Sequence, residues 1–431
     1  MRSPDWHLRF LAEIPIAFHK LSFSVGGERI YTGKEWEKGL ETVEKKVRGI
    51  IEMVKKQGDE ALLFYTKKYD GLVLKPAELR VKKGEIESAF KEVSLNFIRL
   101  IERAKENVEK FHLREYRQIT KRSRQFSHTT LKGVRFIELW RPVEKVGVYV
   151  PGGKYAYPSS VLMTMVPAKV AGVVRISMAS PPGKLSSEVL VAARICGVEE
   201  IYKVGGAQAI AAFAYGTETI PKVDKIVGPG NVYVTTAKRL LFGDVGIDML
   251  AGPSEILIIA DGSANPDYIV SDLLAQVEHG RGATARLITT SKKIRDIVQK
   301  KIKKKGVYLM WVGSIKEALR LANEFAPEHL EILTNKPERI LPEIKNVGEI
   351  FLGKWSPVAI GDYYAGPSHV LPTGGTARFS SGLSVKDFLK RMVVVACSEK
   401  GLRSSARDII NFAKIEGLES HAESIKVRLK K

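Results

Sequence analysis

The spacing of apolar residues changes along this chain, and the change separates regions with different expected structures. Between residues 40 and 112 they recur every three or four positions, most clearly in segments 42–56 and 85–108. Charged residues fill the intervening positions, a pattern typical of helices that cover the outside of a domain. We therefore expect a mainly helical exterior layer over residues 40–112.

From residue 146 onward, short apolar runs alternate with helical stretches. Strands are expected at residues 146–150, 175–179, 201–204 and 225–227, and helices at 187–196, 207–215 and 232–241. Alternation of this kind predicts a parallel, doubly wound sheet.

A second α/β series begins at residues 255–260, an almost continuous apolar run typical of a strand buried on both faces. Asn265 and Pro266 suit the N-cap and first position of a helix that is expected to run to His279. The tail from Ser384 to Lys431 is expected to be helical, with a short final strand at 424–429. Further strands are expected at residues 286–289, 307–312, 330–333 and 348–352.

The composition indicates a soluble, globular protein. Of its 431 residues, 44% are hydrophobic and 27% are charged, and no run of 18 apolar residues that could span a membrane occurs. Charged residues interrupt the first 20 positions, so a signal-peptide core is not expected. Only Cys196 and Cys397 are present. Two isolated cysteines exclude a disulfide framework and a thiolate zinc site, and they favour a cytoplasmic location.

The formal net charge of +21 has two interpretations. Basic clusters at residues 114–124, 300–305 and 430–431 could form a nucleic-acid-binding surface. However, no known nucleic-acid-binding motif and no interleaved aromatic residues accompany these charges. We therefore favour a solvated basic surface.

Four of the eight histidines lie in the second half of the chain beside other polar residues, and these four are the main candidates for chemistry. They are His279, His329, His369 and His421. Imidazoles combined with carboxamide or carboxylate oxygens can hold a divalent metal and leave coordination places open, as a catalytic site requires.

The neighbours of these histidines suggest specific roles, each with a simpler alternative. Gln276 and His279 are three residues apart near the end of an expected helix, so they can share a ligand, or His279 can cap the helix. Glu328 and His329 precede a strand, where they suit water activation and proton abstraction, or form an exposed polar pair. Asp362 is a metal ligand or a turn residue.

Glycine-rich segments follow three of the expected strands, at residues 151–153, 205–208 and 228–231. The carboxyl ends of strands are where open α/β sheets bind ligands, and helix N-termini at this edge can receive phosphates. None of the segments matches the dinucleotide-binding pattern G-x-G-x-x-G. The sequence thus indicates a phosphate or nucleotide nearby without specifying which.

Nine motifs, in the same order as in the family, together resemble the histidinol dehydrogenase family, which carries out the last two oxidations of histidine biosynthesis. The resemblance spans about residues 40–430. The motifs are Val146-Gly-Val-Tyr-Val-Pro-Gly-Gly153, Val204-Gly-Gly-Ala-Gln-Ala209, Gly228-Pro-Gly-Asn231, Asp248-Met-Leu-Ala-Gly-Pro-Ser-Glu255, Gln276-Val-Glu-His-Gly280, Ala326-Pro-Glu-His-Leu330, Gly361-Asp-Tyr363, Ser368-His-Val-Leu-Pro-Thr373 and Glu416-Gly-Leu-Glu-Ser-His-Ala422.

This resemblance implies an α/β fold with two doubly wound, incomplete Rossmann-like domains and small N-terminal and C-terminal extensions. The first domain would combine residues 40–147 and 250–380 and carry the metal and catalytic residues. Residues 148–249 would form an inserted domain that contacts NAD. Residues 1–39 would be an N-terminal extension, and residues 381–431 an arm that crosses to the other subunit of a homodimer with shared active sites.

The resemblance also implies which residues hold each group. Glu328 and His329 would be the catalytic acid/base pair. Zinc would be held by Gln276, His279, Asp362 and His421. Histidinol would be contacted by Ser254, Gln276, His279, His329, Asp362, His369, Glu416 and His421. NAD would be contacted by Tyr149, Gln208 and Asn231.

The expected activity is therefore the zinc- and NAD-dependent oxidation of L-histidinol to L-histidine through bound L-histidinaldehyde, without a membrane or nucleic-acid partner. Two alternatives remain open. One is a zinc-dependent hydrolase, which the missing dinucleotide pattern favours. The other is a basic nucleic-acid-binding protein that retains an inactive enzyme fold.

Overall fold

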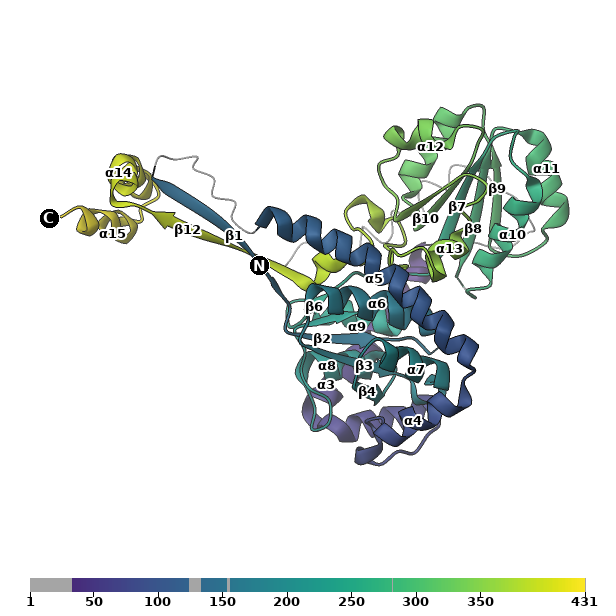
Figure 1. Ribbon diagram of the computed structural model, residues 1–431, viewed down its shortest axis with the longest axis horizontal. Helices are drawn as coiled ribbons and strands as arrows, with labels where there is room; N and C mark the ends of the chain where they lie inside the picture. Colours follow the sequence, from purple (N-terminus) through teal and green to yellow (C-terminus); the bar gives the residue numbers. More distant parts are fainter. Residues whose placement is uncertain (1–32, 124–132, 153–155, 281, 431) are drawn as a thin grey trace.

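The computed structural model describes residues 33–123, 133–152, 156–280 and 282–430. Most of the predicted N-terminal extension (residues 1–32) and Gly153 of the first glycine-rich segment lie outside the described residues. Two five-stranded parallel sheets and one antiparallel strand pair form the framework (Figure 1). Two similar α/β sheets were expected, and this expectation is confirmed.

The first sheet has the strand order β4-β3-β2-β5-β6. Its strands are β2 (Lys145–Tyr149), β3 (Arg175–Ser180), β4 (Glu200–Lys203), β5 (Lys225–Val227) and β6 (Gly246–Ile247). The helices between them are α6 (Pro158–Ala171), α7 (Ser187–Ile195), α8 (Gly206–Tyr215) and α9 (Val232–Leu241). The strand order reverses between β2 and β5, and the carboxyl ends of strands at such a reversal are where open α/β sheets bind ligands.

The second sheet has the order β11-β10-β7-β8-β9, which is the same topology when strands are counted along the chain. Its strands are β7 (Glu255–Ala260), β8 (Thr284–Thr289), β9 (Val307–Trp311), β10 (His329–Leu333) and β11 (Glu349–Leu352). Its helices are α10 (Pro266–Val277), α11 (Lys292–Lys301), α12 (Ile315–Phe325) and α13 (Val358–Tyr363). Apolar side chains pack on both faces of each sheet, as doubly wound sheets require.

Three N-terminal helices cover the first sheet. They are α3 (Gly33–Asp70), α4 (Lys83–Glu92) and α5 (Leu95–Ser123). Helix α3 packs on α8 and α9, α4 packs on α7, and α5 packs on α6 and α7. Residues 40–147 were expected to form one domain with residues 250–380, whereas these helices pack on helices that belong to the sheet of residues 145–247. Helical periodicity identifies the buried face of a helix but not the sheet that covers it.

The arm differs from its prediction. Strand β1 (Val134–Pro142) pairs antiparallel with β12 (Leu389–Cys397), and the chain continues into α14 (Glu399–Ile415) and α15 (Glu419–Leu429). The expected all-helical start of the tail and its final strand at 424–429 are therefore wrong. The apolar alternation in 424–429 resembled a strand, but α15 packs against α14. The partner of β12 lies more than two hundred residues earlier, where local patterning cannot identify it.

None of the helices in the described ranges combines the length and apolar character that crossing a membrane would need.

Candidate active site

The predicted catalytic residues meet at the amino edge of the second sheet. Strands β7, β10 and β11 are parallel neighbours that begin with Glu255, His329 and Glu349, respectively. Ser254 and Glu328 immediately precede two of these strands. Because parallel strands begin at one edge, residues far apart in the sequence become neighbours there.

Glu328 is the most strongly bound of these side chains. Its Oε2 accepts hydrogen bonds from Ser254 Oγ at 2.6 Å and from the Glu255 backbone N–H at 2.8 Å. Burial raises the pKa of Glu328 to about 8, against these two hydrogen bonds, and the negative charges of Glu255 and Asp362 add to the rise. A carboxyl group with a pKa near neutrality can both donate and accept a proton during catalysis.

The two ring nitrogens of His329 differ, because Nδ1 has polar neighbours within reach and Nε2 has no hydrogen-bond partner among the described residues. Its Nδ1 lies 3.2 Å from the Glu255 carbonyl oxygen and 3.5 Å from Glu328 Oε2. Its Nε2 is buried, has no hydrogen-bond partner in the described part of the chain, and lies 3.9 Å from Asp362 Oδ1. Burial lowers the pKa of His329, with partial opposition from Asp362. The neutral ring, with its proton on Nδ1 facing the carbonyl, presents a basic Nε2.

The hydrogen bonds of Ser254 orient Gln276. The hydroxyl proton of Ser254 goes to Glu328, so Ser254 Oγ can only accept from Gln276 Nε2, which lies 2.8 Å away. The amide group of Gln276 is buried at the end of α10, and this assignment leaves its oxygen available as a ligand. A carboxamide oxygen was one of the predicted metal donors.

A pocket of about 680 Å³ lies between elements of the two sheets at this edge. Gln276 at the end of α10, the following His279 and Asp362 of α13 line it, together with residues of α5 and α6. Asp272 and Glu278 also line the pocket, and none of its described lining residues is Lys or Arg. Carboxylates without basic side chains favour a cationic ligand or a metal ion.

The donors in this pocket fit a divalent cation only in part. An amide oxygen, an imidazole and a carboxylate are suitable ligands, and zinc requires a fourth donor or a substrate atom. In the described part of the chain, no three His, Cys, Asp or Glu side chains lie close enough together to hold a metal ion. One predicted donor, Gln276, is an amide, and another, His421, lies elsewhere.

Glu416 and His421 lie on the arm. Glu416 follows α14 and His421 is in α15, and both side chains are exposed. The arm extends away from both sheets (Figure 1), so these two residues do not reach the pocket within one chain. The structure thus brings together Ser254, Gln276, His279, Glu328, His329, Asp362 and His369, and leaves Glu416 and His421 apart.

His369 connects the site to α6, beside the first sheet. Its Nδ1 lies 2.8 Å from the Asp362 carbonyl oxygen and its Nε2 lies 3.3 Å from Ser160 Oγ on α6. The neighbouring Ser368 donates a hydrogen bond of 2.9 Å to the carbonyl oxygen of Met163. Both ring nitrogens of His369 therefore have protein partners, and the ring holds the Asp362 segment against α6. His369 could bind a substrate only if one of these two hydrogen bonds broke and the substrate took its place.

The predicted NAD contacts gather at the carboxyl edge of the first sheet. Tyr149 ends β2, Gln208 lies in α8 and Asn231 is the N-cap of α9. Tyr149 and Gln208 are buried, and the Tyr149 hydroxyl accepts a 3.0 Å hydrogen bond from Gly206 N–H. Asn231 is exposed, and its Oδ1 accepts from the backbone N–H of Tyr233. These residues lie at the edge of the sheet where helices α8 and α9 begin.

Glu349 also lies at the site, although the sequence did not indicate it. This half-buried residue is the register partner of His329 on the adjacent strand. Burial raises its pKa to about 7, and the charges of Asp362 and Glu328 contribute. Only the pairing of β10 with β11 places this third carboxyl group at the site, so no local motif could have indicated it.

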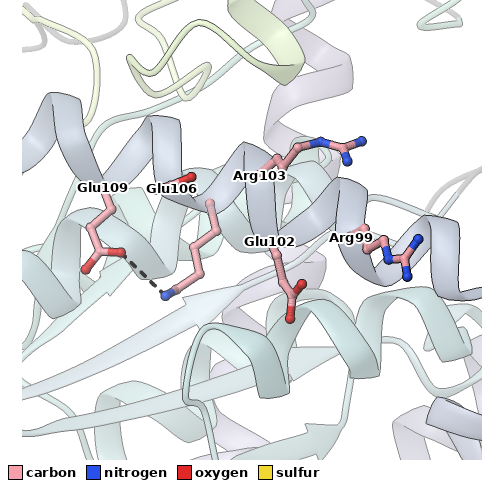
Figure 2. Close-up of a pocket in the computed structure, with 6 residues that line it drawn as sticks. Arg99, Glu102, Arg103, Glu106 and Glu109 are labelled. Carbon is pink, nitrogen blue, oxygen red and sulfur yellow. Dashed lines mark hydrogen bonds and ion pairs between the residues drawn. The ribbon is translucent and has the colours of Figure 1, made fainter.

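A second hollow lies on the exposed face of α5 and is shown in Figure 2. Lys105 Nζ lies 3.5 Å from Glu109 Oε2, an ion pair one helical turn apart. Pairs of this kind support an isolated helix only weakly and indicate no catalytic arrangement. The hollow is lined by Arg99, Glu102, Arg103, Lys105, Glu106 and Glu109.

Comparison with known proteins identifies the family of this chain. The family model described as histidinol dehydrogenase matches residues 34–429. A histidinol dehydrogenase of Caldanaerobacter subterraneus is 50% identical over 404 residues, which cover 90% of this chain and 92% of the relative. That of Clostridium acetobutylicum is 47% identical over 429 residues, with 94% and 97% covered.

A solved structure gives the same assignment. The crystal structure of histidinol dehydrogenase from Elizabethkingia anophelis matches this chain with a TM-score of 0.84 at 34% identity, over 99% of this chain and 96% of the other. The similarity therefore extends over both sheets and the arm. We conclude that this chain belongs to the histidinol dehydrogenase family.

Proposed function

We propose that this protein oxidises L-histidinol to L-histidine in two NAD-dependent steps, with a zinc ion in the site and L-histidinaldehyde held between the steps. Family membership supports histidinol as the substrate and histidine biosynthesis as the pathway. The observation that carries the mechanism is the buried Nε2 of His329, which has no hydrogen-bond partner among the described residues, on a ring whose Nδ1 lies beside Glu328.

Zinc would be held by Gln276, His279 and Asp362 of one copy and by His421 of a second copy. When bound, zinc would coordinate the imidazole and amine nitrogens of histidinol and so fix the position of its alcohol carbon. The acidic pocket and the Nε2 hydrogen bond that orients Gln276 toward Ser254 support this donor set. A homodimer would place the arm residue Glu416 against the substrate in the partner's pocket.

The surface of the arm supports such a dimer. Large apolar side chains on it are exposed in a single chain, with Val395 at 63%, Phe412 at 68% and Ile415 at 85%. An exposed apolar surface on a projecting arm indicates an interface. A second copy of this chain is the partner that would cover both arms by one symmetric exchange.

In the first oxidation, His329 Nε2 would take the proton of the substrate hydroxyl while the hydride of the alcohol carbon passes to NAD. The products are the aldehyde, NADH and an imidazolium. The Glu255 carbonyl and Glu328 carboxyl beside Nδ1 would stabilise this cation and keep the ring oriented.

In the second oxidation, the aldehyde would first be hydrated. Glu328 would take a proton from water as the water oxygen bonds to the aldehyde carbon, and the imidazolium of His329 would return its proton to the aldehyde oxygen. His329, neutral again, would then take a hydroxyl proton of the hydrate as the second hydride passes to another NAD. The lowered pKa of His329 and the raised pKa of Glu328 suit these roles near neutral pH.

NAD would bind at the carboxyl edge of the first sheet, where Tyr149, Gln208 and Asn231 gather. The reversal of strand order between β2 and β5 and the N-termini of α8 and α9 support this location. The two cysteines are free, which fits the cytoplasm as the proposed compartment.

The test is to count the NADH formed per histidinol by zinc-loaded protein. The proposal predicts two NADH per histidinol, with histidine as the product and no aldehyde released. The variant His329→Gln should bind zinc and NAD but form NADH at a rate lower by about a thousandfold or more, as expected when a catalytic base is removed. Folded, zinc-loaded protein that forms no NADH from histidinol would overturn the proposal.

A further inference from the structure

The loop at residues 228–231, between β5 and α9, is held by a buried ion pair outside the catalytic site. Lys238 Nζ donates to the Gly228 carbonyl oxygen at 2.9 Å, and Asp248 Oδ2 accepts from the Gly228 N–H at 2.7 Å. Lys238 and Asp248 also pair directly, and their side chains are only 3% and 0% exposed. Both backbone polar groups of one glycine are thus bonded to opposite charges.

The conformation of Gly228 shows how closely the loop is fixed. Its φ of 111° lies in the left-handed region, and a Cβ there would lie 2.1 Å from the Tyr149 carbonyl oxygen. The loop backbone is therefore pressed against the end of β2. A buried ion pair stabilises a fold less than well-packed apolar groups of similar volume often do. The pair at this position has a geometric effect that apolar side chains could not supply.

The Lys238–Asp248 pair is also connected to the catalytic residues through the chain. Asp248 begins the segment 248–254 that joins the two sheets, and Thr235 Oγ1 of α9 donates to the carbonyl oxygen of Ala251 at 2.7 Å within it. The segment ends at Ser254, whose hydroxyl is bonded to Glu328. The loop beside Asn231 and the catalytic carboxyl group are therefore anchored to one short segment.

We propose that Lys238 and Asp248 are positioning residues that set the 228–231 loop for NAD binding. This inference rests on the proposed NAD site at the carboxyl edge of the first sheet. Neither residue touches the reacting atoms. Their effect is to hold the Gly228 backbone, and through it the start of α9, at a fixed place relative to the segment that carries Ser254.

The experiment compares Lys238→Met, Asp248→Leu and the double variant in the zinc-loaded, full-length enzyme. Each single change leaves one buried charge unpaired and lowers the melting temperature, whereas the double change removes both charges and restores much of the stability. Neither backbone group of Gly228 regains its partner in the double variant. We therefore expect KM for NAD to rise about tenfold in all three, with KM for histidinol within about twofold of the original.

Two further variants sharpen the comparison. Asp248→Asn keeps an oxygen that can accept from the Gly228 N–H, so its KM for NAD should rise less than that of Asp248→Leu. Glu200→Gln is the control, because Glu200 pairs with Arg175 at the opposite edge of the same sheet, with Arg175 Nη2 2.8 Å from Glu200 Oε1. KM for NAD should not change in this control.

The inference is overturned if the folded double variant keeps the original KM for NAD, or if KM for histidinol rises equally. It is also overturned if Asp248→Asn and Asp248→Leu behave alike. An unmodified enzyme that forms no NADH from histidinol would instead refute the proposed function. NADH binding, followed by its fluorescence, gives the same comparison independently of turnover.

Discussion

Replacing Glu328 by glutamine should make the protein more stable at alkaline pH while slowing the proposed aldehyde oxidation. Burial raises the pKa of Glu328 from its ordinary value of 4.5 to about 8. The folded protein therefore binds this proton more tightly than the unfolded chain does. The substituted glutamine side chain would carry no charge, and its amide oxygen could still accept from Ser254 Oγ and the Glu255 N–H.

The sign and size of the change in the free energy of unfolding follow from proton linkage. Between the unfolded and folded pKa values the folded state holds more protons, so the free energy of unfolding falls as pH rises. At 1.36 kcal/mol per pH unit, the ionisation of Glu328 costs the folded state about 4 kcal/mol between about pH 5 and pH 9. This loss is complete above the folded pKa and absent in the variant.

The assay is urea unfolding of metal-stripped wild type and Glu328→Gln at about pH 5 and pH 9, at equal protein concentration. Other buried acids, such as Glu331 with its pKa raised to about 9 by burial, are present in both proteins and largely cancel in the difference. The stability of the variant relative to wild type should increase by several kcal/mol from the lower to the higher pH. An identical difference at both pH values would refute the reasoning.

Three further predictions concern catalysis and metal binding. Glu328→Gln should slow aldehyde oxidation more than alcohol oxidation in single-turnover experiments, because only the second step needs water activation; equal slowing would contradict that role. Gly361→Ala would place a Cβ 2.7 Å from the Phe351 ring and 3.1 Å from Glu349 Oε2. It should displace the adjacent Asp362, weaken zinc binding in a metal titration and cost about 1–3 kcal/mol of stability. The control Gly262→Ala, with no atoms within 4 Å of its Cβ, should change neither quantity. His421→Ala should lose zinc and activity together, and full zinc content in this variant would exclude His421 as a ligand.

Local patterns predicted the elements that depend on nearby residues. Asn265 accepts a hydrogen bond from the Asp267 N–H as the N-cap of α10, and Pro266 follows it, as the sequence indicated. The alternation of short apolar strands with helices predicted both parallel sheets, because this pattern also depends on nearby residues. The predicted single helical run over residues 85–108 is instead broken at Val93, which is extended with ψ of 151°.

Features that depend on long-range pairing could not be predicted in this way. Strand β12 exists because it pairs with β1, and Glu349 reaches the site because β11 lies beside β10. The ion pair of Lys238 with Asp248 could likewise not be predicted, because no local sequence pattern indicates that either residue is buried. The adjacent Glu328 and His329 were predictable because their chemistry lies in one short motif.

Mixing two inactive variants tests most directly the claim that each site combines the core of one copy with the arm of another. In a heterodimer of His329→Ala with His421→Ala, one site regains both side chains and the other lacks both. After verified subunit exchange, random pairing predicts recovery of about a quarter of the original activity. A mixture that exchanges subunits and remains inactive would contradict the shared site.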